Sequence, residues 1–394
     1  MRDNDIQHCT RCGLPQTWEI TRFDKDGICN YCRCYDAVKD TLCDFKRWQQ
    51  LFADHLNTYK GQFEYDVVVG FSGGKDSTYI VYSLKEHYHC NVLAVTVDFG
   101  FMPTEPAKQN IARVIDCLGV DHLFYKIDEK EAKNAFAHRA KKGGVCSLCT
   151  MLCWAVPRKI ANERQAPFYI LGSDRGQLLR SFSPETRPVS GIDVINHMLT
   201  DYSTEKTTRS DNTKTAAAVR KGLQMTGFSA QLSEKLYPDP SFLAGTRAYP
   251  LELLYFLFHP YNEKELKKLI AEQTNWRLPD GNGLHSHHDC ELHDAALYYI
   301  QQATGNTITT GELCVDVREG SIARDEAMHT LALERERLLA MKNPYTAFEK
   351  HFGVTHEDVA AASQKLRRRL SRMIALRKTQ LLFSKPTLKL LQNH

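Results

Sequence analysis

One stretch of the chain decides the fold: Val67-Val68-Val69-Gly70-Phe71-Ser72-Gly73-Gly74-Lys75-Asp76-Ser77. Its β-branched run predicts a buried strand, and the residues from Lys75 to His87 have the pattern of a helix. The two adjacent glycines let the backbone approach an anion closely, and the start of the helix offers free amide groups and the positive end of its dipole. Ser72 and Ser77 add hydroxyl donors, and Lys75 adds a positive charge. The stretch therefore predicts a strand–loop–helix unit that binds a phosphate group.

Further short apolar runs follow, separated by helices. Strands are predicted over 92–97, 122–127 and 168–171, with a helix over 106–118 between the first two. This alternation predicts an α/β fold with a doubly wound parallel sheet, covered by helices on both faces and binding its ligand beyond the carboxyl ends of the strands. The expected parts are a zinc ribbon over 1–40, a connecting helix over 41–62, an α/β domain over 63–202, a polar flexible loop over 203–221, and a mainly helical region over 222–394.

The hexapeptide Ser72-Gly73-Gly74-Lys75-Asp76-Ser77 resembles the signature of the PP-loop ATP pyrophosphatases, also called adenine nucleotide alpha-hydrolases, which have a HUP-like fold. The resemblance implies that a carbonyl oxygen attacks the α-phosphate of ATP, so that pyrophosphate leaves and the substrate is adenylated. All six residues would then bind the pyrophosphate portion with Mg²⁺, and Lys75 and Asp76 would take part in catalysis. A carbonyl oxygen esterified with AMP is a good leaving group, and the nucleophile that replaces it stays open.

By the same resemblance, three residues at the ends of later strands would line the nucleotide site: Asp98, Gly172 and Asp174. Asp98 would lie beside the adenosine, although a helix cap or turn role suits it equally. Asp174, in Gly172-Ser173-Asp174-Arg175-Gly176, is a candidate contact to a metal ion or to the substrate.

The first cysteine cluster predicts a metal site. Cys9, Cys12, Cys29 and Cys32 form two C-x2-C pairs separated by sixteen residues, which is the spacing of a zinc ribbon. A module of this size has little core of its own, and the metal would therefore supply most of its stability. Structural zinc is the favoured interpretation, with an iron–sulfur site or no metal as alternatives.

The second cysteine cluster lies close to the centre of the chain, at Cys146, Cys149 and Cys153. In a helix that starts near Ser147, Cys149 and Cys153 lie one turn apart, and Cys146 precedes the positive end, where thiolates are favoured. The three thiols could hold a [4Fe-4S] cluster, carry and resolve a persulfide, or be structural. Cys290, in a segment with four histidines between 285 and 293, is an alternative third cluster ligand.

Two branches of the PP-loop family are similar to this chain. The cysteine pairs, the loop and Val156-Pro157-Arg158-Lys159-Ile160-Ala161 resemble the N-acetyl sugar amidotransferases of surface-polysaccharide pathways, which receive ammonia from a separate glutaminase. The tRNA thiolases and related small-molecule sulfurtransferases are similar in combining a zinc knuckle, the loop and three cysteines. An ammonia-using enzyme has no need of three closely spaced cysteines, so sulfur transfer is favoured.

The favoured acceptor is a carbonyl group of a small molecule or nucleobase, with a sulfur donor protein or sulfide as the partner. Amidation of an N-acetyl sugar is the alternative and thiolation of tRNA the second. A non-enzymatic ATP-binding sensor on the same fold also stays open.

Composition and charge bear on the partners and the location of the protein. With 394 residues, 42% hydrophobic content and a net charge of +4, the chain carries no strong field directed at nucleic acid. A basic amphipathic segment over 365–389 keeps RNA as a candidate partner, although it is not favoured, and its apolar stripe is the basis for expecting a homodimer. The polar N-terminus and the lack of an apolar run of about 20 residues indicate a cytoplasmic protein without a membrane partner. Thirteen cysteines in such a protein indicate metal binding or sulfur chemistry.

Overall fold

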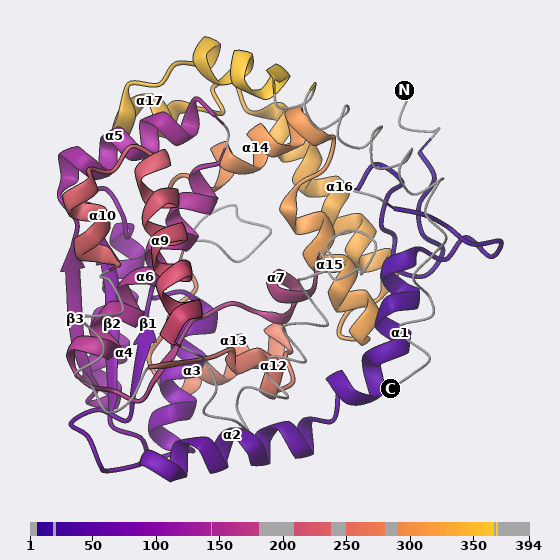
Figure 1. Cartoon of the computed structure of the whole chain (residues 1–394). Coiled ribbons are helices and arrows are strands. Elements are labelled where there is room, and N and C mark those ends of the chain that lie inside the picture. Colours follow the sequence, from indigo (N-terminus) through magenta and orange to yellow (C-terminus); the bar gives the residue numbers. More distant parts are fainter. Residues whose placement is uncertain are drawn as a thin grey trace.

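The computed structural model describes residues 6–18, 21–142, 144–180, 209–237, 250–279, 290–365 and 368. Its centre is a parallel sheet in the order β3-β2-β1-β4-β5 (Figure 1). The strands are β1 (Val67–Gly70), β2 (Val92–Asp98), β3 (Asp121–Lys126), β4 (Phe168–Ile170) and β5 (Leu251–Leu253). Strands β2 and β3 extend the sheet on one side of β1, whereas β4 and β5 extend it on the other. The binding crevice of such a sheet lies where the order reverses, which is between β1 and β4.

Helices cover both faces of this sheet, which confirms the doubly wound α/β fold predicted from the sequence. Successive residues of a strand point to opposite faces, so Val68 packs into one core, whereas Val67 and Val69 pack into another. The first core contains residues of α5 (Glu129–Ala140) and α6 (Val145–Glu163). The second contains residues of α2 (Phe45–Tyr59), α3 (Lys75–Glu86) and α4 (Glu105–Leu118).

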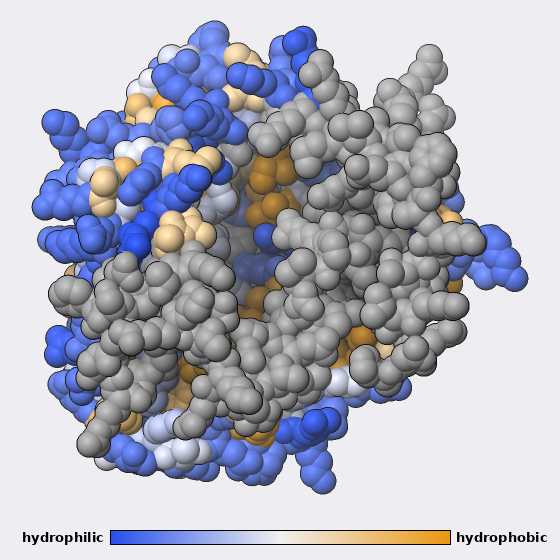
Figure 2. Space-filling view, viewed as in Figure 1, coloured by the Kyte–Doolittle hydropathy of each residue, from blue (hydrophilic) through white to orange (hydrophobic). Residues whose placement is uncertain are grey.

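The later part of the chain is mainly helical, as expected. Its helices are α9 (Arg209–Met225), α10 (Ala230–Leu236), α12 (Tyr255–Phe258), α13 (Glu263–Gln273), α14 (His293–Thr304), α15 (Ile308–Glu319), α16 (Arg324–Ala340) and α17 (Thr346–Phe352). Helix α15 packs closely against α7 (Arg175–Leu179), which follows β4. The face shown in Figure 2 is hydrophilic at its outer edges, and hydrophobic residues show in the hollow at its centre.

The cysteine-rich N-terminal module lies against α15 and α16, far from it in sequence (Figure 1). Gly311 of α15 makes room for the indole of Trp18, because a Cβ at this glycine would stand 2.5 Å from the ring. The Nε of Arg324 donates a hydrogen bond to the carbonyl of Cys9 at 3.4 Å. The module therefore belongs to the body of the protein and shares its core with the C-terminal helices.

Two element predictions differ from the structure. A helix, α1 (Asn30–Leu42), begins within the range assigned to the ribbon and ends before α2, whose first turn is capped by the Asp44 carboxylate. Helix α9 occupies residues 209–221, which the sequence analysis assigned to a flexible loop; residues 203–208 lie outside the described part of the chain. The run Ala216-Ala217-Ala218 has a high helix propensity, which outweighs the polar residues around it.

Among the described helices, none combines the length and the apolar character needed to cross a bilayer.

Candidate active site

The loop over 72–77 joins β1 to α3 at the crevice between β1 and β4. Gly73 has a φ of +77°, and a Cβ at this position would stand 2.6 Å from the carbonyl oxygen of Ala107, so both the turn and its neighbour require glycine. The Ser72 hydroxyl accepts a hydrogen bond from the Gly74 amide at 3.2 Å. The indole N–H of Trp276 donates to the Gly73 carbonyl at 3.0 Å. The loop is thus held by α4, by Trp276 and by a hydrogen bond of its own, with the first amides of α3 at its end.

Charged groups surround the start of α3. Lys75 is only 3% exposed, and its Nζ lies 2.5 Å from Asp76 Oδ2 and 3.7 Å from Glu263 Oε2. Burial by itself lowers the pKa of Lys75, but Asp76, Glu263 and Asp174 outweigh it and raise this pKa above its ordinary value. Burial, aided by Asp174 and opposed by Lys75, raises the pKa of Asp76 to about 6. Lys75 therefore stays charged, and this region has a surplus of carboxylates that a bound cation would neutralise.

A cavity of about 280 Å³ opens beside this loop. Its walls combine residues of the loop with the ends of β2 and β4 and with α6; among them are Ser72, Gly74, Lys75, Asp76, Ser77, Val95, Thr96, Val97, Gly172, Ser173 and Gln177. Gly172 lies directly behind Ser77, since a Cβ at this glycine would stand 3.3 Å from the Ser77 amide nitrogen. A cavity of this size, with an anion-binding loop on one wall and apolar strand residues on another, suits a phosphorylated ligand with a flat apolar part.

Three thiols line the same cavity: those of Cys149, Cys153 and Cys290. Cys149 and Cys153 lie one turn apart on α6 with their Sγ atoms 3.9 Å from each other. The Cys290 thiol, which precedes α14, lies 3.6 Å from the Met102 sulfur. Cys146 is half-buried in the first turn of α6 and does not line the cavity; burial, followed by Cys149, raises the pKa of this thiol to about 12.

Two of the acidic residues picked out in the sequence lie at the margin of this cavity and are not among its lining residues. Asp98 ends β2, and its carboxylate accepts a hydrogen bond from the Gly100 amide at 2.8 Å, which is the turn role. Asp174 caps α7 by accepting a hydrogen bond from the Gln177 amide at 2.7 Å, and it contributes to the electrostatics of Lys75 and Asp76.

A protein family and a solved structure are similar to this chain. Residues 56–157 match the family model described as asparagine synthase. This segment contains the loop over 72–77. Among solved structures, the U34-tRNA thiolase NcsA from Methanococcus maripaludis, described with its [4Fe-4S] cluster, matches over 90% of this chain and 96% of its own, at 14% identity and a TM-score of 0.32. None of the curated proteins compared matches the chain.

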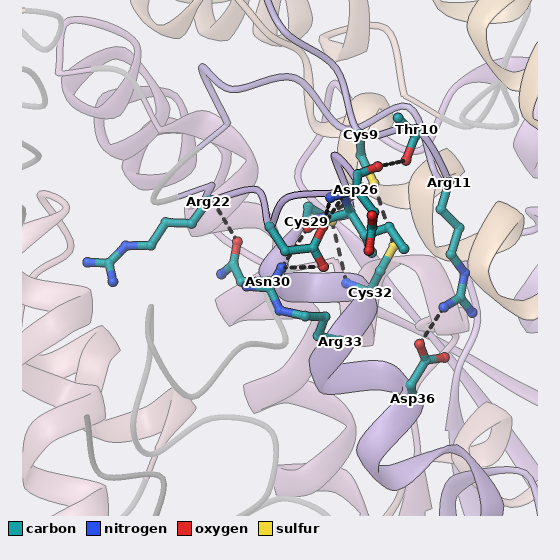
Figure 3. Close-up of polar contacts among 12 residues, drawn as sticks. Cys9, Thr10, Arg11, Arg22, Asp26, Cys29, Asn30, Cys32, Arg33 and Asp36 are labelled. Atoms are coloured by element: carbon teal, nitrogen blue, oxygen red, sulfur yellow. Dashed lines mark hydrogen bonds and ion pairs between the residues drawn. The ribbon is translucent and has the colours of Figure 1, made fainter.

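The cysteine centre of the N-terminal module brings all four predicted ligands together. The Sγ atoms of Cys9, Cys12, Cys29 and Cys32 lie within 4.8 Å of one another, and all four residues are buried. The hairpin between the pairs is closed by the Thr10 hydroxyl, which donates to the Asp26 carbonyl at 3.1 Å (Figure 3). The amides of Cys12 and Cys29 approach the Cys9 sulfur at 3.5 and 3.3 Å, which favours a thiolate at this atom.

The spacing of these sulfurs fits a tetrahedral metal ion. A tetrahedron with zinc–sulfur bonds of about 2.3 Å has edges of about 3.8 Å. The Cys12–Cys29 and Cys9–Cys32 sulfur distances are 3.7 and 3.9 Å. A disulfide bond is only about 2.05 Å long, so these are four free thiols arranged as a closed ligand set. Four sulfur ligands with no open position are typical of a structural zinc site.

Several residues of the site carry no signal in the sequence. The Tyr261 hydroxyl donates to Asp76 Oδ1 at 3.0 Å, and Trp276 and Glu263 come from the same later segment. Asp316 of α15 lies near Asp174; burial, followed by that neighbour, raises the pKa of Asp316 to about 8. These residues reach the PP-loop only through tertiary packing, so no local pattern marks them.

The other sequence features contribute less. Residues 285–289 of the histidine-rich segment lie outside the described residues, as does most of the basic segment over 365–389. The acids that follow the histidines form ion pairs: Glu291 with Lys350 at 2.7 Å and Asp294 with Arg337. They join α14 to α16 and α17 and do not line the cavity.

Proposed function

We propose that this protein is an ATP-dependent sulfurtransferase that adenylates a carbonyl oxygen of a small molecule or nucleobase and replaces this oxygen with sulfur. The single observation that carries the proposal is that the PP-loop and three thiols line one cavity of about 280 Å³. A group that activates oxygen and a group that delivers sulfur must reach the same carbon atom, and their positions in one cavity meet this requirement.

The first half-reaction uses the PP-loop. The carbonyl oxygen of the acceptor attacks the α-phosphorus of ATP, the bond from this phosphorus to the bridging oxygen breaks, and pyrophosphate leaves. The amides at the start of α3 and the charge of Lys75 bind the departing pyrophosphate. Mg²⁺, when bound, would neutralise part of the phosphate charge, and Asp76 and Asp174, two of the three carboxylates near Lys75, would hold it.

The second half-reaction uses the thiols. A sulfur nucleophile attacks the adenylated carbon, the carbon–oxygen bond breaks, and AMP leaves with the oxygen. When the sulfur arrives as a persulfide on Cys149, its outer atom forms the carbon–sulfur bond. The Cys153 thiolate then attacks the Cys149 sulfur, the sulfur–sulfur bond to the product breaks, and a disulfide forms. The two sulfurs, now 3.9 Å apart, close to about 2.05 Å, and a thiol reductant returns the two electrons.

The same thiols would hold an iron–sulfur cluster. Cys149, Cys153 and Cys290 are three soft ligands in one cavity, which is the donor chemistry such a cluster requires. A cluster bound there would supply an open iron site for sulfide, whereas Cys146, outside the cavity, would take no direct part. The protein's own contribution is to place the thiols opposite the PP-loop.

Alkylation protection tests the shared cavity without knowledge of the acceptor. We expect a non-hydrolysable ATP analogue with Mg²⁺ to slow the iodoacetamide labelling of Cys149, Cys153 and Cys290, because the ligand and the thiols compete for one space. Cys117, an exposed cysteine on α4, is the matched control and should label at the same rate with or without the nucleotide. Equal labelling of all four cysteines in both conditions would remove the support for a joint site.

A comparison of sulfide with ammonium tests which nucleophile replaces the oxygen. AMP formation is measured with a panel of nucleobases, nucleosides, tRNA and N-acetyl sugars, each with sulfide or ammonium, and the products are identified by mass spectrometry. We expect a thiolated product that requires sulfide and is lost in Cys149→Ser and Cys290→Ser, but kept in Cys117→Ser. A product that forms with ammonium and not with sulfide would establish an amidotransferase in its place.

A further inference from the structure

Arg318 is a buried cation, and two of its three guanidinium nitrogens have no hydrogen-bonding partner among the described residues. It lies near the end of α15, its side chain is 7% exposed, and its Nε and Nη2 atoms are buried with no hydrogen bond among the described residues. Among the residues that the structure describes, no carboxylate forms an ion pair with Arg318. An isolated buried charge costs several kcal/mol, so its retention requires a compensating negative charge nearby.

The ionisable groups that act most strongly on Arg318 are cysteine sulfurs. Its guanidinium carbon lies 5.7 Å from the centroid of the ring of Tyr31, which stands inside the second C-x2-C pair, between Cys29 and Cys32. Burial by itself lowers the pKa of Arg318, but Cys12, Cys314, Cys32 and Cys29 together outweigh it and raise this pKa. Tyr31 and Cys314 are buried in the same small core as the four cysteines of the centre.

A divalent ion bound to four thiolates leaves a centre with two net negative charges. In water these charges would be screened, but this centre is enclosed by protein, and all four cysteines are fully buried. The uncompensated guanidinium and the uncompensated centre therefore neutralise each other in part. Guanidinium N–H groups are also suitable hydrogen-bond donors to thiolate sulfur. The Nε and Nη2 atoms of Arg318 have no other partner among the described residues.

We infer that Arg318 is the outer-shell residue that balances the charge of the metal–tetrathiolate centre and retains its metal ion. It is a positioning residue, since it acts on the metal through the cysteines. Its place on α15 means that the N-terminal module is completed by a residue from the distant C-terminal region. Metal retention thereby depends on the packing of α15.

The experiment measures zinc release. Full-length protein loaded with one zinc equivalent is mixed with a chromogenic chelator at neutral pH, and the release rate is followed by absorbance. Arg318→Gln removes the charge but keeps a polar side chain, whereas Arg318→Lys keeps the charge. Arg337→Gln is the matched control: this arginine is paired with Asp294 and lies on the neighbouring helix α16, thirteen residues after Arg324, the residue that contacts Cys9.

We expect Arg318→Gln to release zinc about 10- to 100-fold faster than the wild type, the range that loss of an outer-shell partner produces. Arg318→Lys should lie closer to the wild type, and Arg337→Gln should equal it. If Arg318→Gln does not fold, the rise in melting temperature on adding zinc is measured for the wild type and for Arg318→Lys. We expect Arg318→Lys to keep this rise. Release from Arg318→Gln no faster than from Arg318→Lys, or a full-length protein that takes up no zinc, would overturn the inference.

Discussion

Substitution of Gly73 by alanine should disable the PP-loop, and the structure allows the effect to be separated from ordinary backbone strain. Gly73 has a φ of +77°, and a Cβ there would stand 2.6 Å from the Ala107 carbonyl oxygen and 2.8 Å from the Ile111 side chain. Ordinary contact begins near 3.4 Å, so the loop or α4 must move by about 0.8 Å. The nearest atom belongs to a helix backbone, which cannot rotate away as a side chain can.

Gly119 provides the control on the same helix. It follows the last residue of α4 with a φ of +58°, and nothing lies within 4 Å of the Cβ that alanine would add. Both substitutions cost about 1–2 kcal/mol for the left-handed backbone. Gly73→Ala adds an overpacking cost of about 1–3 kcal/mol, so it should be destabilised by about 2–5 kcal/mol in total.

Urea unfolding and calorimetric titration with a non-hydrolysable ATP analogue measure the two consequences. We expect Gly119→Ala to bind the nucleotide like the wild type, whereas Gly73→Ala should lose at least about tenfold in affinity, equivalent to 1.4 kcal/mol, because its amides no longer converge on the phosphate. The reasoning fails if both variants lose the same free energy of unfolding and Gly73→Ala keeps the wild-type affinity.

Three further outcomes follow from buried charges and from the metal centre. Burial lowers the pKa of His259 to about 4, so the unfolded chain binds a proton at this imidazole at a higher pH than the folded chain does. The free energy of unfolding should therefore fall by about 3 kcal/mol as the pH falls from 6.5 to 4, and urea unfolding of His259→Asn should show a smaller fall. Arg175, fully buried, donates from Nε to Glu319 at 2.7 Å; Arg175→Met should cost about 3–5 kcal/mol in unfolding experiments, and Arg175→Met/Glu319→Leu should recover most of it. Chelation of the metal should lower the melting temperature and weaken nucleotide binding in calorimetry, whereas a cysteine centre with no part in holding the fold would leave both unchanged.

The features that the sequence predicts well are local ones. The strand, loop and helix around Gly73 are contiguous, and the two C-x2-C pairs need only a hairpin to meet. The boundary between α1 and α2 also has a local signal, because Asp44 is a residue type that caps helices and it caps α2. The residues over 209–221 were misjudged because polarity was given more weight than the helix propensity of three consecutive alanines.

The rest depends on tertiary packing, which no window of sequence contains. Tyr261 and Trp276 reach the PP-loop from a segment without any motif. Cys146 and Cys149 share a local pattern, yet only Cys149 lines the cavity, where Cys290 joins it. The direction in which a helix turns its cysteines is set by what packs against it, and here α6 packs against β1 and β2.

Helix α15 is the physical connection between the metal centre and the PP-loop domain. Its Arg318 lies over the Tyr31 ring of the cysteine-rich module, whereas Glu319, the next residue, pairs with Arg175 at the start of α7, the helix that Asp174 caps. Breaking this buried ion pair is costly, so α7 and α15 keep a fixed relation. A displacement of α15 on metal loss would therefore reach Asp174 and, through its charge, Lys75. We therefore expect a closed metal site that contributes no wall to the cavity to affect the geometry of the phosphate-binding end.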